Sequence, residues 1–166
     1  SLDPLSRPQS VFALQKELSR EGERRYTKLT VSEKVRMQFD SMVSETKKLR
    51  HCINRLKGRK VIFTNAPMNY AIRVLNVLGI ADLFTVVFSV ESTKFHPKPS
   101  VRGFQQLLHV IKAKASDCVM MEDNLPALMT AKRMGMKTVW ISKSLQKPSF
   151  VDLRINNVLA LTHSRI

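Results

Sequence analysis

Short apolar runs alternate with helix-type patterns between residues 58 and 142, and this alternation is the feature that most constrains the fold. The stretches between the runs have apolar residues three or four positions apart, which is the spacing of an amphipathic helix. Strands that alternate with helices form a parallel sheet covered on both faces, so the sequence predicts an α/β fold. The predicted strands are residues 60–64, 84–90, 118–121 and 138–141.

Local punctuation indicates where the predicted helices begin and end. Gly58 and Gly79 follow helical patterns, and a residue without a Cβ readily takes the left-handed conformation that ends a helix. Tyr70 is expected on the buried face of the helix that ends at Gly79, and Ser100 is expected to cap the next helix. Residues 157–161 are predicted to add an edge strand.

The N-terminal third of the chain has helical patterns and lacks convincing strand runs. We therefore expect a helical segment over residues 1–57 and an α/β core over residues 58–166. The stretch that ends at Asp40 fits two structures. Alternating apolar and polar residues from Val35 to Phe39 favour a strand, while apolar residues every four positions favour a helix. We favour the helix.

Polar residues follow three of the predicted strands, at the sheet edge where parallel sheets bind ligands. Thr64 and Asn65 end the first strand, Lys98 lies between two prolines after the second, and Glu122 and Asp123 end the third. Hydroxyl groups and helix N-terminal amides hold phosphate oxygens, an ammonium offsets the charge of a transferred group, and a carboxylate holds Mg²⁺. The set predicts phosphoryl-transfer chemistry.

Each of these residues also has an ordinary structural explanation. A threonine that ends a strand, such as Thr64, often caps its own turn, and Lys98 could be a solvated loop lysine. Glu122 and Asp123 could cap the following helix, because acids are favourable at a helix N-terminus. Adjacent carboxylates nevertheless repel each other unless a cation binds them, and the residues are spaced as a set. We therefore favour a site.

The charge of the chain favours anionic partners. Lysine and arginine total 28 against 13 acidic residues, which gives a formal net charge of +15. The basic residues are spread along the chain and no nucleic-acid motif accompanies them, so we expect a small phosphorylated metabolite rather than nucleic acid. No apolar run is long enough to cross a bilayer and no signal peptide is recognisable, so we expect a cytoplasmic protein without membrane contact.

Three segments resemble the haloacid-dehalogenase superfamily of hydrolases, most closely its pyrimidine 5′-nucleotidase-like phosphatases. They are RKVIFTNAPMNYAIRVLNVLGIADLF, FHPKPSVRGFQQLL and CVMMEDNLPALMTAKRMGMKTVWIS, and the resemblance covers residues 49–161. It implies a Rossmann-like core, a shortened helical cap in residues 1–57, and Mg²⁺-dependent hydrolysis of a small phosphate ester such as a nucleoside monophosphate.

The resemblance also implies a role for each candidate residue. Thr64 would bind phosphate with help from the Asn65 amide. Lys98 would stabilise the phosphoryl group and the nucleophile. Asp123 would bind Mg²⁺ directly, together with Glu122.

The first motif of the family, D-x-D at the end of the central strand, does not occur in this sequence. Its first aspartate attacks phosphorus and its second acts as general acid and base. Before Thr64 the only aspartates are Asp3 and Asp40, and Asp40 is a weak nucleophile candidate because the second aspartate would fall on Met42.

Three explanations for the missing motif stay open. The chain is a fragment without its first strand, a degenerate relative that binds without turnover, or one part of an oligomer in which another chain completes the sheet. The resemblance places the missing strand between residues 60–64 and 118–121. We expect a hydrolase domain with little or no turnover on its own; the alternative is a non-catalytic binding or scaffold domain for an anionic partner.

Overall fold

The computed structural model describes the backbone of residues 33–163 and the side chains of residues 41–161. Two compact units divide at Lys47–Lys48. Helix α2 (Glu33–Arg55) begins in the first and ends in the second. Asp40 lies inside this helix, so the strand alternative for the stretch before it is wrong. Among the described residues, no helix combines the length and the apolar character needed to cross a bilayer.

The last turns of α2 belong to the second unit because two of their side chains are buried in it. Ile53 packs with Leu75 and Ile80, and Cys52 packs with Val139. The observed division therefore lies earlier in the chain than the predicted boundary at 57/58. The assignment of residues 1–57 as a shortened cap stays a prediction.

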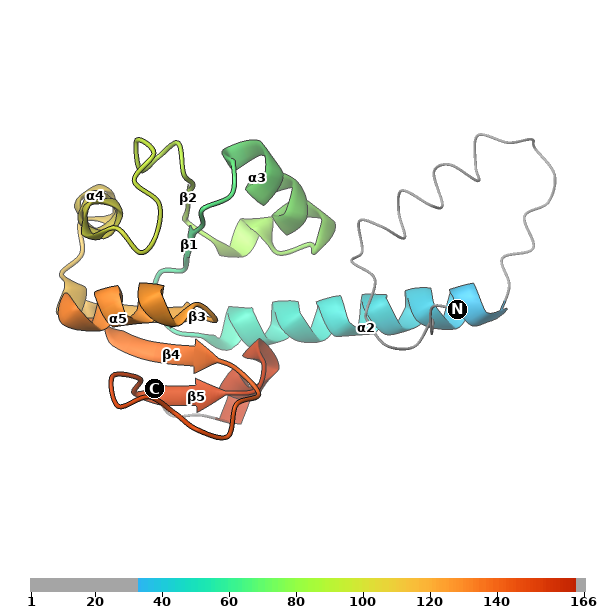
Figure 1. Cartoon of the computed structure of the whole chain (residues 1–166). Helices are drawn as coiled ribbons and strands as arrows, with labels where there is room; N and C mark the ends of the chain where they lie inside the picture. The colour runs from blue at the N-terminus through green and yellow to red at the C-terminus, as the bar shows by residue number, and fades with distance from the viewer. Residues whose placement is uncertain (1–32, 164–166) are drawn as a thin grey trace, which may run out of the picture. The chain divides into compact units, whose positions relative to one another are not determined.

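The second unit has the alternating order that the apolar runs predict, and the α/β fold is confirmed (Figure 1). Each predicted strand is present, and the first two are shorter than their apolar runs. The elements are β1 (Val61–Phe63), α3 (Met68–Val77), η1 (Ala81–Leu83), β2 (Val86–Phe88), α4 (Val101–Ile111), η2 (Ala115–Asp117), β3 (Val119–Glu122), α5 (Leu125–Arg133), β4 (Lys137–Ile141), β5 (Leu153–Ile155) and η3 (Val158–His163).

All strand pairs are parallel, but they form two sheets. One contains β1 and β2, and the other has the order β3–β4–β5. Within the described residues β1 pairs only with β2, and β3 pairs only with β4. The hydrogen-bonded ladder is therefore interrupted between β1 and β3, where the family resemblance places the missing strand.

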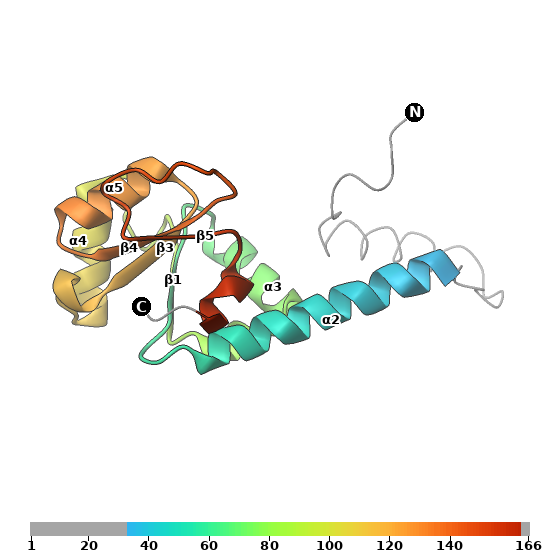
Figure 2. The same cartoon turned by 90° about the horizontal axis from the view of Figure 1, so that it is seen from below.

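Phe104 of α4 is the centre of the packing between the two sheets. It is fully buried and packs with Ala127 and Ala131 of α5. Its ring meets that of Phe63 in β1 edge to face, with the ring centroids 5.1 Å apart. Met120 of β3 packs against the same cluster. Figure 2 shows α4 and α5 together at one end of the unit. Burying a phenylalanine contributes about 1.5–3 kcal/mol, so this residue ties together elements that no strand ladder connects.

Three local predictions differ from the structure. Tyr70 is 56% exposed, because α3 is buried through Ala71 and Leu75. Ser100 directly precedes α4 as predicted, but its side chain makes no capping hydrogen bond. The predicted edge strand at 157–161 is wrong, because β5 lies earlier and a 3₁₀ helix follows it.

The side chain of Asn157 gives the reason for the last difference. Its Oδ1 accepts a hydrogen bond from the Ala160 N–H at 3.2 Å. Asparagine side chains that bond to nearby backbone groups start turns and helices rather than strands.

Candidate active site

Lys98 and Glu122 form an ion pair at the edge of the unit where the strands end. The Lys98 ammonium donates to Oε2 of Glu122, and each side chain is only 12% exposed. The ammonium also lies 5.2 Å from the ring centroid of Phe63, at the end of β1. A lysine held by a carboxylate and an aromatic face is not a freely solvated loop residue.

Asn65 holds the backbone of the same lysine. The Lys98 N–H donates to Oδ1 of Asn65 at 2.8 Å, and Nδ2 of Asn65 donates to the Lys98 carbonyl at 3.0 Å. The end of β1 and the loop after β2 are therefore joined through one side chain.

Thr64 continues the β1–β2 pairing and caps the turn that follows. Its N–H donates to the Phe88 carbonyl at 2.9 Å, and its hydroxyl oxygen accepts from the Ala66 N–H at 3.0 Å. The ordinary structural role of Thr64 is thus present. Its hydroxyl hydrogen is still able to donate to a bound anion, because a hydroxyl both accepts and donates.

Glu122 and Asp123 have different surroundings although they are neighbours. Oε1 of Glu122 accepts from the N–H groups of Asp123 and Asn124, at 3.0 and 3.3 Å. The carbonyl of Asp123 accepts from the Trp140 indole at 3.0 Å, which fixes the turn, while the residue itself is exposed.

The two carboxyl groups are shifted in opposite directions. Burial raises the pKa of Glu122, but hydrogen bonds with Asp123 and Lys98 and the charge of Lys98 outweigh burial, so the net pKa is lowered. The hydrogen bond with Glu122, together with burial and the charge of Glu122, raises the pKa of Asp123. A cation bound at this turn would relieve the repulsion between the two groups.

Asp123 is the carboxylate best able to hold a metal ion. Both oxygens of Glu122 are already engaged, one by Lys98 and the other by backbone N–H groups. No group of three or more His, Cys, Asp or Glu residues that could hold a metal occurs in the described part of the chain. Mg²⁺ commonly takes one or two protein carboxylates and completes its shell with water and substrate phosphate, and this donor set fits only that arrangement.

One N–H group in the first turn of each of two nearby helices is already occupied. Glu91, which the sequence patterns did not single out, accepts from the Met68 N–H at the start of α3, at 3.1 Å, and from the Ser89 hydroxyl at 2.6 Å. The bond from Ser89 lowers the pKa of the Glu91 carboxyl. At α5, Asn124 accepts from the Ala127 N–H at 3.1 Å. The expected contribution of helix N-terminal amides is therefore not available from these donors, and Thr64 and Lys98 are the better phosphate contacts.

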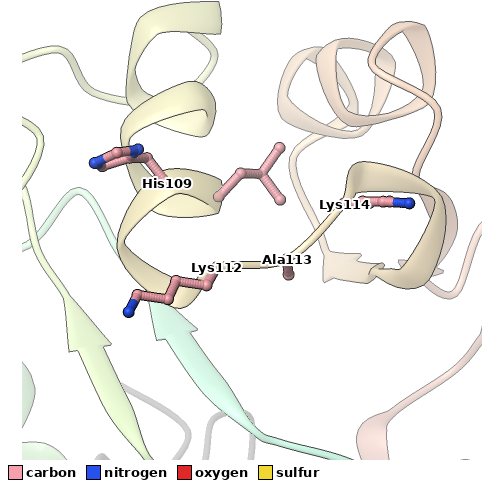
Figure 3. A pocket seen from close by; sticks show the side chains of 5 residues that line it. His109, Lys112, Ala113 and Lys114 are labelled. Carbon is pink, nitrogen blue, oxygen red and sulfur yellow. The ribbon is translucent and has the colours of Figure 1, made fainter.

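A shallow hollow of about 430 Å³ lies at the opposite end of α4 from Lys98. It is lined by Leu108, His109, Lys112, Ala113 and Lys114. Figure 3 shows the side chains of His109 and Lys112 on one side and that of Lys114 pointing the other way. The basic groups do not converge on a common point, so this hollow lacks the geometry of an anion site.

The structure brings four of the six sequence candidates into one connected set. Lys98 is bonded to both Asn65 and Glu122, and Asp123 is bonded to Glu122. Thr64 directly precedes Asn65 at the end of β1. Among the contacts of the described residues, none bonds Thr64 directly to Lys98. The side chain of the nucleophile candidate Asp40 lies outside the described residues, and its role stays a prediction.

Comparisons with known proteins agree with this fold. The family of haloacid dehalogenase-like hydrolases matches residues 10–141. A HAD phosphatase from Thermococcus onnurineus is 19% identical, with a TM-score of 0.57, over 94% of this chain and 86% of that one. A magnesium-bound HAD-hydrolase from Bacillus subtilis is 21% identical, with a TM-score of 0.57, over 76% of this chain and 52% of that one.

A HAD-superfamily hydrolase of subfamily IA from Geobacter sulfurreducens is 12% identical, with a TM-score of 0.58, over 94% of this chain and 88% of that one. At these identities the structural likeness shows the fold alone. The family match covers most of the chain and includes the loop and the strand end that carry Lys98 and Glu122. The chain belongs to the haloacid dehalogenase-like hydrolase family.

Proposed function

We propose that this domain is built for Mg²⁺-dependent hydrolysis of a small phosphate ester, such as a nucleoside monophosphate in the cytoplasm, in the manner of nucleotidase-like phosphomonoesterases. It has little or no turnover on its own, because its sequence has no D-x-D. The observation that carries the proposal is the ion pair between Lys98 and Glu122 at the carboxyl edge of the strands, with Asp123 next to it. Phosphoryl transfer needs a cation and a metal-binding carboxylate close enough to act on one phosphoryl group.

Each residue has a specific task in this proposal. The Lys98 ammonium moves from Glu122 toward a phosphoryl oxygen and offsets its charge, and the Thr64 hydroxyl donates to a second oxygen. Asp123 would hold Mg²⁺, with Glu122 nearby, and the bound ion would neutralise charge at the phosphoryl oxygens. Asp40 stays the weak nucleophile candidate of the sequence; a carboxylate in that role would form an aspartyl phosphate and release the alcohol of the ester.

The structural relatives support the reaction class at a coarse level. One is described as a HAD phosphatase and another as a HAD-hydrolase bound to magnesium. Both facts describe those proteins. For this chain they favour testing phosphate esters with Mg²⁺ before other hydrolase substrates.

The test is a screen of nucleoside monophosphates with the full chain and Mg²⁺, following release of orthophosphate. The expected result is little or no release by the chain on its own, with any measured activity lost in Asp123→Asn and retained in the control Asp117→Asn, an exposed aspartate in η2. Turnover that survives Asp123→Asn would contradict the metal-site assignment. Turnover that survives Asp40→Asn would remove Asp40 as the nucleophile.

The second candidate is a non-catalytic domain that binds an anionic partner. It is favoured by the absence of D-x-D together with the net charge of +15. Retention on heparin that falls steadily with salt, without release of orthophosphate from any ester, would support this candidate. Orthophosphate release that depends on Asp123 would exclude it as the main function.

A further inference from the structure

The side chain of Asn65 makes a two-point contact with one residue, Lys98. It accepts from the Lys98 N–H at 2.8 Å and donates to the Lys98 carbonyl at 3.0 Å. Lys98 thus uses both its N–H and its carbonyl to bond one residue, as a residue in a β-strand does with its hydrogen-bonded partner in the neighbouring strand. Pro97 and Pro99 lack an N–H, so Lys98 supplies the backbone donor of this Pro–Lys–Pro segment.

The other end of Lys98 is held by a different sheet. Its ammonium pairs with Glu122 at the end of β3, whereas Asn65 follows β1. Within the described residues no ladder connects β1 to β3. Strand pairing therefore does not set the position of Lys98 between the two sheets, so the contacts of the Lys98 loop set it.

Other contacts also fix the loop around Lys98, among them the bond from the Ser100 N–H to the Pro97 carbonyl at 2.8 Å. Phe63 lies below the ammonium at 5.2 Å, and the Thr130 hydroxyl of α5 donates to the Pro99 carbonyl at 2.9 Å. None of these contacts is made to the N–H or the carbonyl of Lys98 itself. Among the contacts of the described residues, only Asn65 bonds both peptide groups of Lys98.

We infer that Asn65 is a positioning residue whose side chain fixes the Lys98 backbone and thereby aims the ammonium at the phosphoryl position. This role is distinct from phosphate binding by the Asn65 backbone amide, since replacement of the side chain leaves that amide in place. The inference rests on the proposed function for the identity of the group that Lys98 meets.

The test measures how fast an amine-reactive ester acylates individual lysines of the full chain, by peptide mass spectrometry. Lys98 reacts slowly in the wild type because its side chain is nearly buried and paired. In Asn65→Leu both hydrogen bonds are lost, and Lys98 acylation rises about tenfold, which corresponds to about 1.4 kcal/mol. Asn65→Asp keeps the acceptor and loses the donor, so its effect is intermediate.

Two internal references separate positioning from a general loss of structure. Lys132, which is paired with Asp152, reports loosening of the unit and is expected to keep its wild-type rate. Asn69→Leu changes the same residue type at the start of α3, where Oδ1 of Asn69 accepts from the Tyr70 N–H at 2.7 Å. This control is expected to leave Lys98 unchanged.

The inference is overturned if Asn65→Leu leaves Lys98 acylation unchanged, or if Lys98 and Lys132 rise together. A separate arm adds orthophosphate with Mg²⁺. Slower acylation of Lys98 in the wild type is expected if Lys98 binds a phosphoryl group. Absence of that protection would count against the proposed function, while the effect of Asn65→Leu without phosphate still decides the positioning role.

Discussion

Gly103 is the position where one added methyl group tests the packing of the Lys98 loop. It lies in α4 beneath the loop, and a Cβ built there would lie 2.3 Å from the His96 carbonyl oxygen and 3.5 Å from Cγ2 of Thr93. Real Cβ atoms essentially never approach closer than 3.0 Å, so the loop must retreat from 2.3 to at least 3.0 Å, a shift of 0.7 Å. His96 is two residues before Lys98, so the lysine would move as well.

Two effects of Gly103→Ala oppose each other. Alanine is favoured over glycine inside a helix by about 1 kcal/mol. Overpacking a well-filled site costs about 1–3 kcal/mol, and the upper part of that range applies because the obstacle is backbone rather than a mobile side chain. The His96 N–H is also bonded to the Thr93 carbonyl at 3.1 Å, which limits how far the loop can yield. We expect a net loss of about 1–2 kcal/mol.

Urea unfolding and thermal melting of the full chain measure this loss. A decrease of 1–2 kcal/mol corresponds to a Tm lower by about 3–10 °C for a unit of this size. Gln105→Ala, at an exposed position of the same helix, is the matched control and is expected to change stability by less than about 0.5 kcal/mol. If Gly103→Ala is as stable as the wild type or more stable, the close approach of helix and loop is refuted.

Three further perturbations test other contacts. Lys98→Met leaves the nearly buried Glu122 carboxylate without its cation and should lower the free energy of unfolding in urea by about 1–3 kcal/mol. Adding Glu122→Leu to this variant should recover most of the loss. Additive losses from the two substitutions would contradict the pairing. The hydrogen bond from Lys132 is the main cause that holds the pKa of Asp152 below its usual range. Ionised Asp152 therefore stabilises the fold fully above the unfolded pKa of about 3.9, and this stabilisation is lost as the pH falls through the lower folded pKa. The Tm difference between wild type and Asp152→Asn should therefore be full at pH 6 and shrink below about pH 4, and a difference that persists unchanged at acid pH would argue against it. Asn124→Ala removes the N-cap of α5 and should cost about 1 kcal/mol in thermal melts, whereas Asn124→Asp should retain most of the stability; equal losses in both would exclude the cap.

The sequence by itself determined the order and type of the elements in the second unit. Period and punctuation are local properties, so the four apolar runs, the helices between them and the glycine at Gly79 could be recognised without knowledge of distant contacts. The placement of Lys98, in the loop after β2, and of Glu122, at the end of β3, at one edge followed from parallel topology, which sends the carboxyl ends of the strands to one side. The failure at 157–161 is also local, because a single asparagine side chain changed a strand pattern into a turn.

Only the tertiary structure decided how the candidate residues are connected. The bond between Asn65 and the Lys98 backbone, the carboxylate of Glu91 on the first amide of α3, and the approach of Gly103 to the loop all depend on how elements pack. None of these contacts produces a periodic pattern in the sequence. Each joins one residue to one distant group, whereas a periodic pattern arises when a whole helix or strand face packs against the core. The interruption between β1 and β3 is of the same kind, since strand pairing depends on partners that are far apart in the chain.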